Sequence, residues 1–315
     1  MKQPKIAFFG SPEFALPVLE ALRQHAEIVL VVTQPDKPVG RGNTMTAPPV
    51  ARRAVELGLP LAQPPRLKGN TGFEQALRAS GAELAITSAY GKILPASVLE
   101  IPRMGFINTH ASLLPRYRGA APIQWALING ETQTGITLMQ TDVGMDTGDI
   151  LFQETLEIPS NWTSVDLFGA LSQMAARTLV ELLQNLGNWH STRQDSTQAT
   201  LAPMLTKEDG EIRWHASNTD IYNRYRGTFG WPGSFSFWLG KRLKVTQMAL
   251  SQDSSSALPG TIVSASDTLR VSTGQGCIDL IEVQPENKAK MPARDWFKNF
   301  QIRLGQRFEG SSNSL

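Results

Sequence analysis

Short apolar runs alternate with amphipathic stretches over the first part of the chain. Helix-like patterns cover Glu13–Arg23 and Ser164–Gln184. Strands that are almost wholly apolar are typical of a parallel sheet covered by helices on both faces. We therefore predict an α/β domain with a mostly parallel sheet over residues 1–189. The runs that predict its strands are Ile6–Phe9, Ile28–Val32, Glu83–Ser88, Gly105–Thr109, Ile136–Gln140 and Ile150–Glu154.

The pattern changes in the last third of the chain. Residues 190–206 are polar and lack periodicity, which predicts an interdomain linker. A helical pattern near Asn218–Arg226 follows. Short strands at regular spacing, separated by Gly and Pro, are typical of a small barrel, and we predict an OB-like β-barrel over residues 207–315. Its expected strands are Ser234–Leu239, Leu243–Ala249, Gly260–Val263, Leu269–Ser272 and Cys277–Val283.

Composition limits the class of protein. A chain of 315 residues with 41% hydrophobic and 18% charged residues fits two domains with ordinary cores. The single cysteine, Cys277, excludes an internal disulfide and thiol-rich zinc or iron–sulfur sites. No apolar run approaches the ~20 residues that span a membrane, so we predict a cytoplasmic protein without membrane contact. Residues 207–315 carry 14 Lys and Arg against 11 Asp and Glu, which permits a polyanionic partner.

The most informative motif is the segment from Asn108 to Pro122, which reads NTHASLLPRYRGAAP. Residues i and i+2 of a strand face the same side, so Asn108 and His110 can point to one small volume. Ligands of open α/β sheets collect at the carboxyl ends of strands. An amide and an imidazole there suit chemistry on a carbonyl, with one donating to an oxyanion and one handling a proton. The alternative is a strand end with a structural histidine.

An acidic, glycine-rich loop lies further along, over residues 142–149. Its spacing fails as a calcium loop, because Gly144, Thr147 and Gln153 occupy positions that such a loop assigns to other residues. A simple turn is one interpretation. The other is that Asp146 pairs with His110, fixing its tautomer and preparing it for proton transfer.

Two further loops follow the first two strands. The turn at Gly10-Ser-Pro12 lacks the later glycines of a dinucleotide-binding fingerprint, which disfavours a dehydrogenase. Residues 34–49 form a long loop in which Lys37 and Arg41 lie among glycines and prolines. Such a basic arm suits contact with a phosphate backbone. A solvated surface loop is the alternative.

With the Asn108, His110, Ser112-Leu-Leu-Pro115 and Asp146 pattern, the chain resembles the folate-dependent formyltransferases over nearly its whole length. Matching pieces include Gln34-Pro-Asp36, Ala89-Tyr-Gly91 and Trp231-Pro232. The resemblance is closest to members that formylate the methionyl group of initiator tRNA. Ala111 is a departure, since many relatives carry Gly there.

This resemblance implies a Rossmann-like domain followed by an OB-like domain that helps to hold tRNA. It implies 10-formyltetrahydrofolate as the formyl donor and initiator methionyl-tRNA as the acceptor, with no metal. Asn108, His110 and Asp146 become the catalytic trio. The implied folate-site residues are Ser112, Leu113, Leu114, Pro115, Asp142 and Gly144, and the implied tRNA-binding loop residues are Lys37, Gly40, Arg41 and Gly42.

In this scheme the acceptor amine attacks the formyl carbon, and Asn108 and protonated His110 stabilise the oxyanion while Asp146 assists proton removal. We expect a monomer. Two other functions stay open: formylation of a nucleotide-linked amino sugar, and RNA binding without catalysis on the same scaffold. The basic loop and the positive second domain favour tRNA over the sugar.

Overall fold

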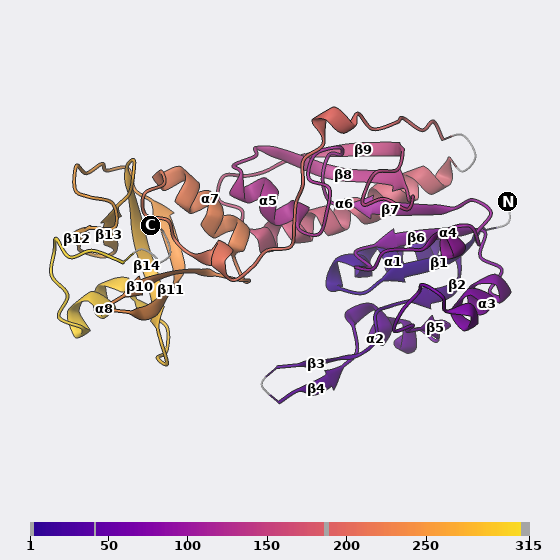
Figure 1. Ribbon diagram of the computed structural model, residues 1–315, viewed down its shortest axis with the longest axis horizontal. Coiled ribbons are helices and arrows are strands. Elements are labelled where there is room, and N and C mark those ends of the chain that lie inside the picture. The colour runs from indigo at the N-terminus through magenta and orange to yellow at the C-terminus, as the bar shows by residue number, and fades with distance from the viewer. Residues whose placement is uncertain (1–2, 41, 186–188, 310–315) are drawn as a thin grey trace. The chain divides into compact units, whose positions relative to one another are not determined.

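The computed structural model describes residues 3–40, 42–185 and 189–309 (Figure 1). The chain divides into two compact units. The first comprises Met1–Pro122, Gln133–Ile158 and Leu167–Pro203, and the second comprises Ile123–Thr132, Pro159–Asp166 and Met204–Leu315. Within the described ranges, no helix combines the length and the apolar character needed to cross a membrane.

The first unit is built on a seven-stranded sheet of order β5-β2-β1-β6-β7-β8-β9. The pairs from β5 to β7 are parallel, and β7–β8 and β8–β9 are antiparallel. The predicted α/β domain with a mostly parallel sheet is confirmed. The strands are β1 (Lys5–Gly10), β2 (Glu27–Val32), β5 (Leu61–Ala62), β6 (Leu84–Ser88), β7 (Phe106–His110), β8 (Gln133–Gln140) and β9 (Ile150–Glu157).

The helices connect these strands. The predicted helix at Ser164–Gln184 has those bounds as α6, whereas the one predicted over Glu13–Arg23 begins as a 3₁₀ turn and continues as α1. The Ala15 amide closes this first turn by donating to the Pro12 carbonyl oxygen at 3.0 Å, three residues back, as a 3₁₀ turn requires. The remaining helices are α1 (Leu16–His25), α2 (Pro49–Glu56), α3 (Thr71–Ala79), α4 (Ala96–Leu99) and α5 (Pro122–Ile128).

The predicted loop over residues 34–49 contains an element that the sequence pattern does not reveal. Lys37–Val39 (β3) and Thr44–Thr46 (β4) pair as an antiparallel hairpin. Figure 1 shows this hairpin projecting from the central sheet of the first unit. Both strands have only three residues and are largely exposed, so they carry no apolar alternation. The long loop predicted here therefore contains a short hairpin that was not predicted.

An aromatic cluster packs against one face of the sheet. Phe9 meets the rings of Phe73, Tyr90 and Phe106 edge to face, at centroid distances of 6.2, 5.4 and 5.2 Å. The hydroxyl of Tyr90 is buried there and has no hydrogen-bond partner among the described residues. Burial raises the pKa of Tyr90 to about 12, because the ionised phenolate would lose its hydration.

Tyr90→Phe should stabilise the protein, because it removes a buried hydroxyl that gains no hydrogen bond. We expect the free energy of unfolding at pH 7 to rise by ~1 kcal/mol. Above pH 10 the unfolded chain loses the Tyr90 proton while the folded chain keeps it, so wild-type stability falls as the pH rises. The advantage of the variant should therefore grow by ~1.4 kcal/mol at pH 11. Urea denaturation of both proteins at the two pH values measures this; an equal difference at both would contradict it.

The second unit carries an antiparallel sheet of order β10-β11-β14-β13-β12, with β15 paired to β14. Residues 305–309 pair with both edges: Glu309 bridges Phe237 on β10, and Arg307 bridges Thr261 beside β12. This closes the sheet into a small barrel, as predicted. The elements are β10 (Ser234–Trp238), β11 (Lys241–Leu250), β12 (Ile262–Ala265), β13 (Leu269–Ser272), β14 (Cys277–Pro285), β15 (Met291–Pro292), α7 (Asn218–Thr228) and α8 (Ala293–Asn299).

The core of the second unit combines aliphatic side chains with a cluster of aromatic rings. The ring of Phe308 stacks on Trp214 and Trp296, at centroid distances of 5.1 and 5.9 Å. Because Phe308 belongs to the segment that closes the barrel, the same residues complete both the sheet and its core.

Candidate active site

Strand β7 presents Asn108 and His110 on the same face, as their spacing predicts. Thr87 lies opposite Asn108 in the register between β6 and β7, and its hydroxyl donates to Asn108 Oδ1 at 2.7 Å. This bond fixes the amide orientation and leaves Nδ2 to point at Asp146. On the other face of β7, the Thr109 hydroxyl donates to Ser88 at 2.9 Å.

Asp146 reaches both side chains from the loop after β8. Its Oδ1 lies 3.6 Å from His110 Nδ1 and 3.4 Å from Asn108 Nδ2. Its Oδ2 accepts a hydrogen bond from the Gly119 amide at 2.9 Å. Asp146 adopts φ 55°, a left-handed conformation that Asp tolerates better than most residues. The structure thus brings the three predicted side chains together.

The imidazole of His110 is 6% exposed and faces a hydrogen-bond acceptor on each side. Nε2 lies 2.9 Å from the Tyr117 carbonyl oxygen, which only accepts, so Nε2 carries a proton. Nδ1 faces the Asp146 carboxylate. Both ring nitrogens therefore face oxygen atoms, the Tyr117 carbonyl at Nε2 and the Asp146 carboxylate at Nδ1. The contacts from Asp146 to Asn108 and His110, at 3.4 and 3.6 Å, are both longer than the 2.9 Å contact between His110 Nε2 and the Tyr117 carbonyl oxygen.

Gly119 must be glycine for this arrangement. Its φ is +122°, and a Cβ there would lie 2.7 Å from the Ala202 carbonyl oxygen. The Gly119 amide is thereby held where it donates to the Asp146 carboxylate.

The loop that carries Asp146 is held by its own polar groups. Asp142 Oδ1 accepts from the Gly144 amide at 3.0 Å and from the Thr147 hydroxyl at 2.8 Å. Asp142 and Gly144 are exposed. In the structure these two predicted folate-site residues therefore shape the loop around Asp146.

Gln194 fixes the same loop from a distant part of the chain. Its amide nitrogen donates to the carbonyl oxygens of Asp146 and Gly148, at 2.9 and 2.7 Å. Its Oε1 accepts from Nε and Nη2 of Arg118, at 3.1 and 2.7 Å. Gln194 and Arg118 are both buried.

The other predicted folate-site residues form a compact turn after β7. The Ser112 hydroxyl donates to the Arg116 carbonyl oxygen at 2.6 Å, and the Leu114 amide donates to the Thr137 hydroxyl at 3.1 Å. The Pro115 carbonyl oxygen accepts from the Thr200 amide, and Leu113 is partly exposed. This turn lies directly beside His110 in the chain.

The predicted tRNA-binding residues lie in the β3–β4 hairpin, where Lys37, Gly40 and Gly42 are exposed. Arg41 lies outside the described residues. The Lys37 ammonium donates to Gln34 Oε1 at 2.5 Å. No hydrogen bond joins the described residues of the hairpin to Asn108, His110 or Asp146.

Three groups that hold Asn108 or Asp146 in place were not predicted from the sequence: Thr87, the Gly119 amide and Gln194. Thr87 sits in a predicted strand next to β7, so strand adjacency could have found it. Gly119 stands in the quoted motif, but its backbone donor has no sequence signal. Gln194 lies in a polar stretch without periodicity, where nothing local marks a long-range contact.

The sequence matches the Formyl transferase family over residues 4–183 and the Formyl transferase, C-terminal domain, family over residues 204–301. The chain belongs to the formyltransferase family. The family predicted from the motifs is therefore confirmed.

The relatives of this formyltransferase match it along nearly its whole length. It is 56% identical to the methionyl-tRNA formyltransferase of Deinococcus radiodurans, over 97% of this chain and 96% of that protein. It is 45% identical to the enzyme of the same name from Caldicellulosiruptor saccharolyticus, over 95% and 98%. A solved N-formyltransferase from Helicobacter canadensis, in complex with folinic acid and dTDP-3-aminofucose, has a similar fold, with a TM-score of 0.67 and 17% identity over 90% of this chain and 100% of that one.

Proposed function

We propose that this formyltransferase moves a formyl group from 10-formyltetrahydrofolate to the free amino group of the methionyl moiety of initiator methionyl-tRNA, which supplies N-formylmethionyl-tRNA for translation initiation. The assignment of methionyl-tRNA as the acceptor rests on the 56% and 45% identity to curated methionyl-tRNA formyltransferases over nearly the full chain. The convergence of Asn108, His110 and Asp146 supports the chemistry.

In the proposed mechanism, the acceptor nitrogen forms a bond to the formyl carbon while the carbonyl electron pair moves to oxygen. The Asn108 amide and the His110 imidazolium donate to that oxyanion. Asp146 accepts a proton from the attacking nitrogen. The carbonyl then reforms, the bond from the formyl carbon to the donor nitrogen breaks, and the proton passes to that nitrogen.

We propose that Ser112, Leu113, Leu114 and Pro115 line the donor site, with Asp142 and Gly144 at its border. The turn follows His110 directly, and the Asp142 loop carries Asp146, so both elements lie next to the proposed reacting carbon. The proposed domain division is a catalytic part over residues 1–189, a linker over 190–206 and a tRNA-holding part over 207–315. Action as a monomer stays a prediction.

The β3–β4 hairpin is the proposed contact with the acceptor stem, through Lys37, Gly40, Arg41 and Gly42. Arg41→Ala should raise KM for methionyl-tRNA roughly tenfold, because one charge-assisted phosphate contact is lost. Affinity for the folate donor should stay unchanged. Steady-state kinetics with each substrate varied in turn measures both values. Arg78→Ala, an exposed arginine on α3, is the matched control, and an equal loss for donor and acceptor would contradict this role.

A single assay tests the acceptor. Purified protein and 10-formyltetrahydrofolate are offered methionyl-tRNA and, in parallel, a nucleotide-linked amino sugar. We expect formylation of methionyl-tRNA at much the higher kcat/KM. Preference for the sugar would contradict the proposed acceptor but would leave the proposed roles of Asn108, His110 and Asp146 intact. Salt-sensitive RNA binding without turnover of either acceptor would contradict the proposed formyltransferase activity.

A further inference from the structure

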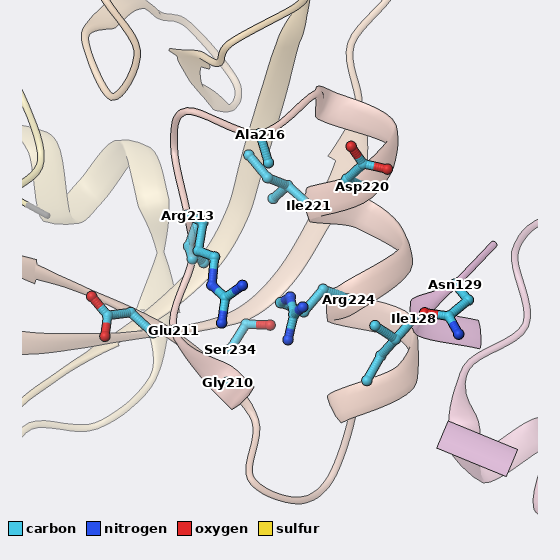
Figure 2. Close-up of a pocket in the computed structure, with 11 residues that line it drawn as sticks. Ile128, Asn129, Gly210, Glu211, Arg213, Ala216, Asp220, Ile221, Arg224 and Ser234 are labelled. Atoms are coloured by element: carbon cyan, nitrogen blue, oxygen red, sulfur yellow. The ribbon is translucent and has the colours of Figure 1, made fainter. Parts of the chain in front are cut away.

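A cavity of about 380 Å³ lies in the second unit, between the start of α7 and the strand that follows it. Arg213 precedes α7, Arg224 lies on α7 and Ser234 begins β10. Figure 2 shows the two guanidinium groups and the Ser234 hydroxyl directed into the same space. Ile128 and Ile221 supply an apolar wall. None of these residues belongs to the proposed active site.

Arg213 and Arg224 line this cavity together with Glu211 and Asp220, and the two arginines differ in their partners. The Arg213 side chain forms no hydrogen bond or ion pair with any residue in the described part of the chain and is exposed. Arg224 is only 20% exposed; it donates to the Asp209 carbonyl oxygen at 3.2 Å, and its Nη1 lies 3.6 Å from the Asp209 carboxylate. The carboxylates of Glu211 and Asp220 point away from the two guanidinium groups (Figure 2).

The pKa of Arg224 reflects its burial and its charged neighbours. The pKa of Arg224 is lowered, first by burial and then by the positive charge of Arg213, while Asp209 and Asp220 raise it less. Two cations that face one cavity repel each other unless an anion lies between them. Asp209 lies beside Arg224, whereas no ion pair in the described part of the chain gives Arg213 a carboxylate partner.

We propose that this cavity is a phosphate site in which Arg213 and Arg224 clamp one phosphate group. Guanidinium forks match the oxygen geometry of phosphate and bind it through paired hydrogen bonds. The Ser234 hydroxyl is buried, and its one side-chain contact, to Thr228 at 3.4 Å, allows it to donate elsewhere. The volume and the apolar wall suit a phosphate carried on a compact organic group, such as a nucleotide.

The phosphate has two possible sources: a free nucleotide or inorganic phosphate, and the backbone of an RNA. The first is independent of the proposed function, and the second rests on it. Binding is measured without formyl transfer, so failure of this site and failure of the proposed function are distinguishable.

The test uses the full chain in low salt. Isothermal titration calorimetry with inorganic phosphate and with 5′-AMP should show binding that weakens at least about tenfold in Arg213→Gln and in Arg224→Gln. Arg303→Gln, an exposed arginine of the same unit outside the cavity, should bind like wild type. Adenosine without phosphate should not compete. If both cavity variants still bind phosphate and AMP like wild type, the proposal that free phosphates bind in this cavity is wrong.

A second arm measures affinity for tRNA against salt concentration. If the phosphate belongs to RNA, each cavity variant should reduce the slope of log K against log salt by about one, and Arg303→Gln should not. Arg213→Glu gives a check on folding, because a carboxylate facing Arg224 should raise the melting temperature and abolish phosphate binding. If neither small phosphates nor tRNA distinguish the cavity variants from Arg303→Gln, the proposal is wrong.

Discussion

Asn108→Ala and His110→Ala should each lower kcat by about a hundredfold or more, with little change in the fold. Each variant removes one donor to the oxyanion, and loss of one such donor costs ~3 kcal/mol of barrier. The effect should appear in kcat and not only in KM, because the donors act most strongly on the charge that develops in the transition state. Single-turnover formylation of methionyl-tRNA measures the chemical step.

Thr109→Val is the matched control for this pair. Thr109 lies between Asn108 and His110 on β7, but its hydroxyl bonds to Ser88 on the opposite face. Its replacement disturbs the same strand without touching the trio, so turnover should stay near wild type. Circular dichroism and thermal melting confirm that all three variants fold. A His110→Ala protein that keeps most of its turnover would refute the catalytic assignment.

Asp146→Asn should lower kcat by roughly 10²–10⁴, in the range that general acid–base groups contribute. The variant keeps the size of the side chain and an oxygen that can accept from the Gly119 amide. It loses the negative charge beside the His110 imidazole, and it cannot take the proton from the attacking amine. Binding of methionyl-tRNA and of the donor should change little.

Asp149→Asn provides the comparison for Asp146→Asn, because Asp149 lies in the same loop and loses the same charge. We expect it to retain turnover. Equal losses in the two variants would mean that the net charge of the loop matters and that the position of the Asp146 carboxylate does not. Formylation rates at saturating substrates distinguish these outcomes.

Local spacing predicted the part of the candidate site that lies on one strand. Asn108 and His110 face the same side because a strand repeats every two residues, and that rule needs no knowledge of the rest of the fold. The contact of Asp146 with His110 could only be a hypothesis, since it joins a strand to a loop through tertiary packing. The structure supplies that contact, and with it the Gly119 amide as a third partner of the carboxylate.

The elements that prediction missed lack a periodic signal. The β3 and β4 strands are too short and exposed to alternate, whereas α6 has enough turns for its apolar stripe to define both ends. Gln194 shows the same limit for side chains, because a buried amide in a polar stretch looks like any other loop residue until its partners are known. Long periodic elements such as α6 therefore followed from the sequence, whereas short exposed strands and long-range polar contacts did not.

Pairing of residues 305–309 with both β10 and β12 also fixes an order of events during protein synthesis. Until the ribosome has released this segment, the two strands present unpaired amide and carbonyl groups, and the Trp214 and Trp296 rings lack the Phe308 ring that covers them. The nascent second unit is thus most prone to aggregate before residues 305–309 emerge.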